Sequence, residues 1–369
     1  MSSINAGTGI VYNNDGSGTL DLQGGGSSGI SVNSAAPYVK TVANTTAISG
    51  TSGMLVYNTA VNGLSGYTNG FWETISLVPP IYNRAIFGFG GTSFQGGLVS
   101  TTNLVTDTGV VGTDVTGVGT ARFALAAANY GTDKAIFGYG FTNSALNTIN
   151  LVSNTGVVAS NGSGAGTVRC ELAATGYGSS GQAIFGYGSE NLSANLSMTN
   201  LVSNTGVVST DTTGVGTARR ALAAARYSTD RAIFGYGTGP TNITNLVSNT
   251  GVVAANTTGV GTSREQLAAA GYGGDKAIFG YGSTGSVTAI TNLVSNAGIV
   301  TADTTGVGTA RWMLAASTYG VDKAIFGYGR NSAGTSVSMT NLVSNTGVVS
   351  TDVTGVGTAR NQLASASYG

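Results

Sequence analysis

The sequence predicts an all-β protein, a closed six-bladed β-propeller preceded by a small N-terminal β module. Three observations predict this fold. The string Ala-Ile-Phe-Gly occurs six times, each repeat holds four short β-type segments, and the first and last repeats are incomplete in complementary ways. Repeats of this length with four strands are typical of propeller blades, whereas solenoid coils are usually shorter. The six copies begin at Ala85, Ala135, Ala183, Ala232, Ala277 and Ala324.

The repeat around residue 232 shows how turn chemistry separates the predicted strands. Ser228-Thr229-Asp230 forms one tight turn, and Asn249-Thr250-Gly251 forms another. Asn-x-Gly supplies the positive φ angles that such a turn requires. The four strands of this repeat are expected at Leu222–Tyr227, Arg231–Tyr236, Thr244–Ser248 and Val252–Ala254.

The two ends of the repeat region predict that the ring is closed. The first repeat starts at Arg84 without the Leu-Ala-Ala-Ala strand, whereas the chain stops just after that strand, at Leu363–Gly369. We expect this last strand to pair beside Ala85–Phe89 and so complete six four-stranded sheets. Donation of the strand to a neighbouring subunit is the alternative. The core between blades is expected from Ile86 and Phe87, Leu104 and Val105, Val110 and Val111, and their equivalents.

The repeat resembles the kelch family, in which an aliphatic-aromatic-x-Phe-Gly-Gly strand is followed by an arginine that opens the next blade. Ile-Phe-Gly-Tyr-Gly is the counterpart here, although Gly-Gly becomes Gly-x-Gly and the kelch Trp is absent. The resemblance spans residues 84–369 and implies that Leu-Ala-Ala-Ala is the innermost strand. A fold of this kind does not fix a function. The arginine counterparts are Arg122, Arg169, Arg219, Arg264, Arg311 and Arg360.

The repeated arginines have two interpretations. Six equivalent copies favour a structural role, in which each guanidinium donates to backbone carbonyls and ties adjacent blades. The alternative is a positive ring for an acidic ligand. A third interpretation is a local basic patch formed by Arg219, Arg220 and Arg226.

Residues 1–78 lack the repeat and form a separate predicted module, which a Pro79-Pro80 linker at 79–83 joins to the propeller. Gly53–Thr59 and Gly63–Trp72 are expected to form two strands around a turn. This segment resembles a module of bacteriophage tail fibres and other virion proteins, which implies attachment to virion partners and intertwining into a homotrimer. A short Gly-rich stretch is poor material for a monomeric core. The alternative is a loosely folded cap.

Composition excludes several classes of function. Fifteen basic residues balance fifteen acidic ones and charged residues make up 8%, which argues against nucleic acid as a partner. The sequence has no histidine and one cysteine, Cys170, so we expect no metal, no cofactor and no catalytic site. No apolar run long enough to cross a membrane and no signal peptide is found, which predicts assembly inside a cell.

The acidic residues also give little indication of a catalytic or a metal-binding site. Glu171, Glu190 and Glu265 fall in different blades, which disfavours the paired carboxylates of a glycosidase. An Asp or Asn stands three residues before a glycine in every repeat, and we expect it to cap a turn rather than to bind calcium. These residues are Asp114, Asn161, Asp211, Asn256, Asp303 and Asp352.

Variation between the repeats is concentrated in two places, the loop between Gly-Tyr-Gly and Asn-Leu-Val and the residue pair after each arginine. Both are expected to open on one face of the disc, where Trp312 and Phe123 would be exposed. Variation gathered on one face of a regular scaffold is typical of a recognition surface, with neutral loop drift as the alternative. The candidate binding residues are Phe94, Phe123, Phe141, Cys170, Glu171, Arg220, Glu265, Trp312, Arg330 and Asn361.

The resulting hypothesis is a non-enzymatic bacteriophage virion protein, a fibre or appendage that attaches through residues 1–78. Its propeller would bind a host-surface glycan or protein, or decorate the particle. The alternative is a non-viral kelch-like interaction scaffold or a sugar-binding lectin.

Overall fold

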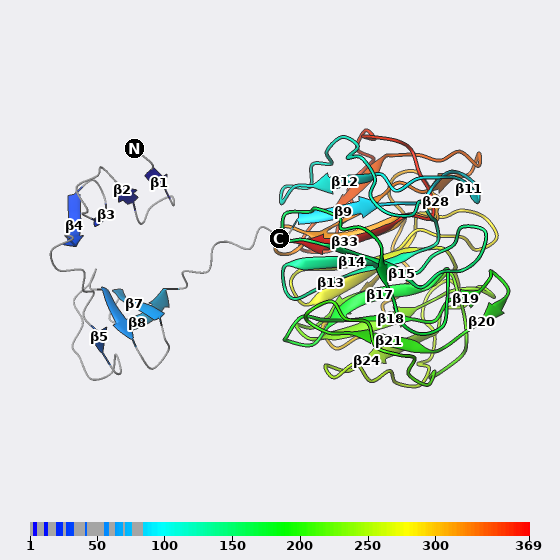
Figure 1. Ribbon diagram of the computed structural model, residues 1–369, viewed down its shortest axis with the longest axis horizontal. Helices are drawn as coiled ribbons and strands as arrows, with labels where there is room; N and C mark the ends of the chain where they lie inside the picture. The colour runs from blue at the N-terminus through cyan, green and yellow to red at the C-terminus, as the bar shows by residue number, and fades with distance from the viewer. Residues whose placement is uncertain are drawn as a thin grey trace. The chain divides into compact units, whose positions relative to one another are not determined.

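The computed structural model describes residues 84–369 throughout and, before them, the backbone of eight strands between Ser3 and Ile75. The chain divides into two compact units, Met1–Pro80 and Ile81–Gly369. Every regular element in the described part of the chain is a β-strand, and the fold is therefore all-β (Figure 1).

The first unit contains two hairpins and one four-stranded sheet. β1 pairs with β2, β3 pairs with β4, and the sheet has the order β5-β6-β7-β8, with β5 parallel to β6. The expectation of a single strand over Gly63–Trp72 is wrong, because Trp72 belongs to a further strand, in which it pairs opposite Tyr67. The strands are β1 (Ser3–Asn5), β2 (Val11–Asn13), β3 (Leu20–Gly24), β4 (Ser27–Val32), β5 (Thr41–Val42), β6 (Leu55–Asn58), β7 (Gly63–Thr68) and β8 (Phe71–Ile75).

Six antiparallel sheets with one common pattern make up the second unit. Each has an inner strand, a middle strand and a third strand. The inner strands are β13 (Ala126–Tyr130), β17 (Ala173–Tyr177), β22 (Ala223–Tyr227), β25 (Ala268–Tyr272), β29 (Ala315–Tyr319) and β33 (Ala364–Tyr368). The middle strands are β14 (Lys134–Gly138), β18 (Gln182–Gly186), β23 (Arg231–Gly235), β26 (Lys276–Gly280), β30 (Lys323–Gly327) and β9 (Arg84–Gly88). The third strands are β15 (Thr148–Val152), β21 (Thr199–Val202), β24 (Thr244–Val247), β27 (Thr291–Val294), β32 (Thr340–Val343) and β12 (Thr102–Val105).

The expected fourth strand, at Val252–Ala254 and its equivalents, is wrong in every sheet, because that segment is joined to the third strand by isolated bridges such as Val202↔Val208. The sheet β13-β14-β15-β16 does have four strands, but β16 (Gly162–Ser163) lies beyond the expected segment. The reason is that a side chain replaces part of the backbone ladder: Asn200 donates its amide to the Ser209 carbonyl at 3.0 Å.

Short strands in the connecting loops complete the second unit. They form the hairpins β10–β11 and β19–β20 and the pair β28–β31, all antiparallel. Their bounds are β10 (Gly91–Ser93), β11 (Gly96–Leu98), β19 (Ser189–Glu190), β20 (Ala194–Asn195), β28 (Arg311–Trp312) and β31 (Arg330–Asn331).

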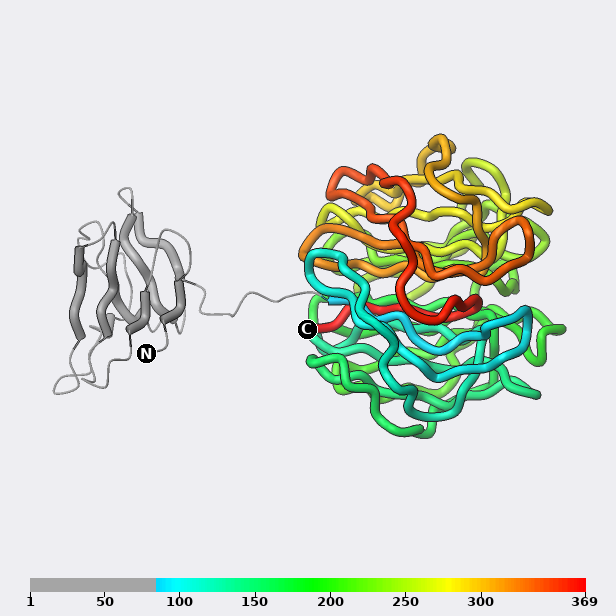
Figure 2. Tube along the Cα trace, turned by 90° about the horizontal axis from the view of Figure 1, so that it is seen from above, coloured from blue at the N-terminus to red at the C-terminus, as the bar shows by residue number. Residues whose placement is uncertain are grey.

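The last strand of the chain completes the first sheet. β33 pairs with β9 along its whole length, from Ala364↔Gly88 to Tyr368↔Arg84. Figure 2 shows the C-terminal segment, in red, beside the cyan segment that begins the second unit. Each inner strand also contacts the inner strand of the next sheet, and β33 contacts both β29 and β13. The contacts between the inner strands therefore form a complete cycle.

The apolar core lies between consecutive sheets. The aromatic residue after each middle strand packs on a phenylalanine of the next sheet, as Tyr187 does on Phe234 with ring centroids 5.2 Å apart. Glycine at the end of the middle strand makes this approach possible, because a Cβ on Gly186 would lie 2.7 Å from the Phe234 ring. The expectation that Val110 and Val111 both enter the core is wrong for Val110, which is 62% exposed because successive residues of an extended segment point to opposite sides.

The aspartates and asparagines before the glycines do not cap their own turns, contrary to the prediction. Each binds a threonine in the segment that enters the inner strand of the same sheet. Asp211 accepts hydrogen bonds from the Thr167 amide and hydroxyl at 2.9 and 2.7 Å, and Asp114 does so from Thr358, 244 residues away. Asn161 binds Thr120 in the same geometry without a charge. We name each pair of an Asp or Asn side chain and its threonine a latch, because its hydrogen bonds fasten the segment that enters the inner strand to the rest of the sheet.

Replacement of Gly186 by alanine tests the contact between sheets. The added methyl group meets the Phe234 ring, and we expect the free energy of unfolding to fall by about 1–3 kcal/mol, the usual cost of overpacking. Gly112→Ala is the matched control, because its methyl group would meet the nearest atom at 3.4 Å and should change stability by about 0.5 kcal/mol or less. Urea denaturation measures both. Equal effects of the two substitutions would contradict the packing argument.

The latches also predict a dependence of stability on acid. Burial raises the pKa of the Asp211 carboxyl, but hydrogen bonds from Thr167 and Asn200 lower it to a net value below that of a free aspartate. A pKa lowered by folding stabilises the protein above the ordinary aspartate pKa, and this stability is lost as the pH falls through the lowered value. Asp114, Asp303 and Asp352 shift in the same direction.

Changing these four aspartates to asparagine, the residue found naturally at 161 and 256, should therefore reduce the fall in Tm between about pH 7 and about pH 3. The measurement is thermal unfolding of the wild type and the fourfold variant across this range. An unchanged fall would show that the latches do not cause it.

Candidate functional site

The two variable regions of the repeat lie together at one end of the sheets. The residue after each arginine bonds to the loop that follows the middle strand. This contact occurs in every repeat as a backbone bridge, a strand pair or a backbone hydrogen bond. The pairs are Phe123 with Phe141, Cys170 with Ser189, Arg220 with Thr238, Glu265 with Ser283, Trp312 with Arg330, and Asn361 with Gly91.

Three candidate binding residues are buried, which corrects the expectation that they form an accessible surface. Phe123 packs on Phe141 with ring centroids 5.5 Å apart, and Cys170 is enclosed beside Ser189, where burial raises the pKa of its thiol. Asn361 donates its amide to the Gly91 carbonyl at 3.1 Å and to the Ser336 hydroxyl at 2.8 Å. Their side chains pack against the loops to which they bond and are covered by them.

Three other candidates form a cluster that we name the aromatic cluster: Phe94, Trp312 and Arg330. Phe94 lies at the tip of the β10–β11 hairpin and stacks on Trp312, with ring centroids 6.2 Å apart and planes 14° from parallel. The Arg330 guanidinium carbon lies 4.8 Å from the centroid of Phe94. Its Nε also donates to the Gly334 carbonyl at 2.6 Å, which fixes the side chain.

The aromatic cluster joins two adjacent sheets and reaches solvent. Phe94 belongs to a loop of the sheet that contains β9, whereas Trp312 and Arg330 border the sheet that contains β29 and β30. Phe94 is 45% exposed and the other two side chains are partly buried. A stacked aromatic pair beside a cation offers an apolar contact surface together with a donor, the combination found in interface hot spots.

The second residue of each variable pair lies at the axis, where it forms an axial ring. The backbone amide of each donates to the carbonyl of the preceding member at 2.7–2.9 Å, and the sixth bond returns to the first member. All six residues have φ between 51° and 55°, a left-handed conformation that holds each amide toward its neighbour. The members are Ala124, Glu171, Ala221, Gln266, Met313 and Gln362.

Side chains at the axial ring carry one ion pair. Arg220 Nε lies 3.1 Å from Glu171 Oε2, and Arg220 also donates to the Leu192 carbonyl. Burial raises the pKa of Glu171 and the neighbouring Glu265 adds to this, while Arg220 and Gln266 oppose it. A cavity of about 110 Å³ lies at the ring. The sequence prediction missed this arrangement, because the six residues come from six different repeats and meet only in the folded chain.

The six repeated arginines are buried between sheets, as their structural interpretation requires, and not in an open positive ring. Each guanidinium carbon lies 4.3–4.9 Å from the centroid of an aromatic ring on the preceding sheet. Five of them donate to the third-strand asparagine of the following sheet. Arg122 donates instead to the Tyr139 and Thr120 carbonyls at 2.7 and 3.1 Å, and burial lowers its pKa to about 10.

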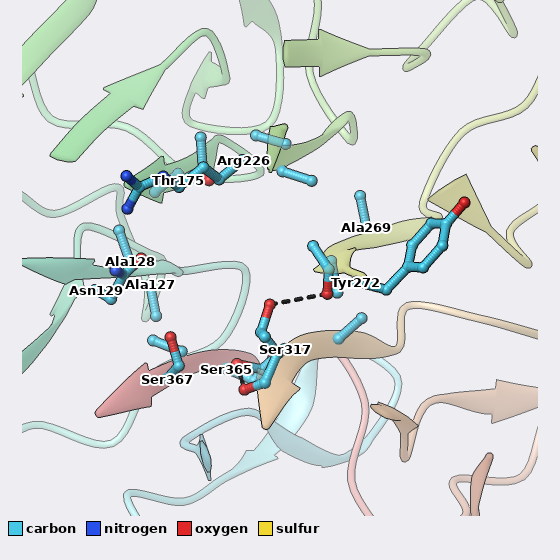
Figure 3. Close-up of a pocket in the computed structure, with 18 of the residues that line it drawn as sticks. Ala127, Ala128, Asn129, Thr175, Arg226, Ala269, Tyr272, Ser317, Ser365 and Ser367 are labelled. Carbon is cyan, nitrogen blue, oxygen red and sulfur yellow. Dashed lines mark hydrogen bonds between the residues drawn. The ribbon is translucent and has the colours of Figure 1, made fainter. Parts of the chain in front are cut away.

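The proposed basic patch of Arg219, Arg220 and Arg226 does not form. Arg219 is buried between sheets, Arg220 pairs with Glu171, and Arg226 lines a cavity along the axis. This axial cavity has a volume of about 370 Å³ and is bordered by all six inner strands (Figure 3). Alanine side chains form much of its wall, because six strands that converge on one axis leave little room for larger residues.

No group of three or more Cys, Asp or Glu side chains is close enough to hold a metal ion in the part of the chain with described positions. Within that same part, no helix is long and apolar enough to cross a bilayer.

Comparison with known proteins supports the fold alone. No family model matches the sequence, and no curated protein matches it. Among solved structures, one described as "Structure of YjhT" is similar with a TM-score of 0.52 and 9% sequence identity, over 66% of this chain and 88% of that chain. At this identity the likeness concerns the arrangement of the strands and carries no activity from one protein to the other.

Proposed function

We propose that residues 84–369 form a six-bladed β-propeller closed by its C-terminal strand. Six sheets with one strand order, the pairing of β33 with β9 and the cycle of contacts between inner strands support this. A kelch-like relationship is part of the proposal, and its support is the placement of each arginine before an inner strand.

We further propose that the protein is a non-enzymatic bacteriophage virion component. It attaches through residues 1–78, and its propeller binds a glycan or protein on the host surface. The observation that carries the binding role is the aromatic cluster of Phe94, Trp312 and Arg330, which lies where the repeats differ from one another. The virion role rests on the resemblance of Gly53–Trp72 to tail-fibre modules.

A carbohydrate is the ligand class that the aromatic cluster suits best. Sugar rings present apolar C–H faces to aromatic side chains, and their hydroxyl groups accept hydrogen bonds from a guanidinium. Phe94 and Trp312 supply the aromatic surface, and Arg330 supplies donors beside it. Stacking fixes the rings before the ligand arrives, which lowers the entropic cost of binding.

Binding of the full chain to a panel of bacterial surface polysaccharides tests the role of the cluster. Trp312→Ala and Phe94→Ala should each weaken binding about tenfold or more, the usual loss at an aromatic hot spot. The matched control is Val348→Ala, because Val348 is 66% exposed on the turn after β32, at the opposite end of the strands. Binding that survives both aromatic substitutions would exclude the cluster as the receptor site.

Solution mass tests the attachment role of residues 1–78. Light scattering should give a trimer for the full chain and a monomer for residues 81–369, which form a compact unit of their own. A monomeric full chain would argue against the fibre proposal and favour a free-standing scaffold or lectin.

A further inference from the structure

The axial cavity differs from its surroundings because the residues that line it are not the same in the six repeats. Inner strands repeat alanine at most positions, but the residue before each final tyrosine is different in nearly every sheet. This residue lines the cavity in five of the six inner strands, and the exception is Gly176. The equivalent residues are Asn129, Gly176, Arg226, Gly271, Thr318 and Ser367.

Arg226 lines the cavity and makes one hydrogen bond within residues 84–369, so most of its guanidinium donors have no partner in this part of the chain. One of its terminal nitrogens, Nη2, donates to the Gly178 carbonyl at 3.2 Å, which turns the guanidinium toward the preceding sheet. Gly176 leaves space there, and a Cβ on it would lie 2.6 Å from Asn129 Oδ1. Figure 3 shows the Arg226 guanidinium, Asn129 and Ser367 on one side of the cavity, and Ser365 next to Ser317.

Hydroxyl groups on the two sides of the cavity differ in their availability. Thr318 donates to the Gly271 carbonyl at 3.0 Å and Ser317 donates to the Thr318 carbonyl at 3.2 Å, so both protons are used. In contrast, Ser365 Oγ is buried and has no hydrogen-bond partner among the described residues. Ser365 therefore offers a hydroxyl donor that Ser317 and Thr318 do not.

The charge of the cavity is positive and uncompensated. Its lining contains no Asp or Glu side chain within residues 84–369, and its other cation, Lys276, is paired with Asp275 at 3.0 Å. Arg226 has no carboxylate within 4 Å in the same part of the chain, and burial lowers its pKa against the pull of the more distant Asp230. A partly buried cation without a partner costs free energy, which an anion would recover.

We propose that the axial cavity is a binding site for a small oxyanion, such as a carboxylate or a phosphate. The Arg226 guanidinium supplies the charge-assisted hydrogen bonds, and Asn129, Ser365 and Ser367 supply neutral donors. The site goes beyond the receptor role and is independent of it, because the aromatic cluster lies in other elements. Its asymmetry gives one binding orientation in a scaffold that otherwise repeats six times.

Isothermal titration calorimetry of the full chain, at constant ionic strength, tests the proposal. The probes are inorganic phosphate, sulfate and D-glucuronate, with glucose as the neutral comparison. The variant Arg226→Gln removes the cation, and Asn129→Asp keeps the shape but places a competing carboxylate beside it. Arg231→Gln is the matched control, because Arg231 is exposed on the same hairpin and its loss changes the net charge equally.

The expected result is saturable binding of at least one anion to the wild type and to Arg231→Gln, weakened about tenfold or more by each of the two cavity variants. Binding of all three anions would define a general oxyanion site, and binding of glucuronate alone would define a site for an acidic sugar. Two results would overturn the proposal: no anion binds the wild type, or Arg231→Gln weakens binding as much as Arg226→Gln does. Circular dichroism verifies that each variant is folded.

Discussion

Contact between consecutive sheets is the constraint on which the second unit depends. A three-stranded sheet with an alanine-rich inner strand has too little apolar surface to be stable alone. Each sheet therefore needs a neighbour on both faces, and the Phe234 ring packed over Gly186 shows how closely the two faces meet. A row of such sheets leaves one face uncovered at each end unless the row closes, and the pairing of β33 with β9 supports the proposed closure.

The repeated polar residues serve the same contact. Each buried arginine lies over an aromatic ring of one sheet and donates to carbonyls or an asparagine of the next, so its charge is solvated by the protein itself. Asp211 and its equivalents fasten the segment that carries the arginine. Because the scaffold is fixed by repeated residues, residues that do not repeat are free to differ between sheets.

Both proposed binding sites consist of such non-repeated residues. Phe94, Trp312 and Arg330 occur once each and meet where two adjacent sheets present their loops. Arg226 and Asn129 interrupt the alanines of two inner strands, and both line the axial cavity. Under these two proposals, a repeated scaffold would carry two asymmetric sites, one at the loop end for a large ligand and one on the axis for a small anion.

The sequence alone determined the six-repeat β organisation and the pairing of the last strand with Ala85–Phe89, because both follow from local patterns. It predicted that the variable positions share one end. Burial of Phe123, Cys170 and Asn361 could not be predicted, because the loop that covers each lies 17 or more residues away, on a path that only the folded chain defines. Tertiary structure likewise decided that the second residues of the variable pairs form a ring and that Arg226 enters the cavity. Such contacts depend on how many sheets surround the axis, and the pattern of a single repeat does not determine that number.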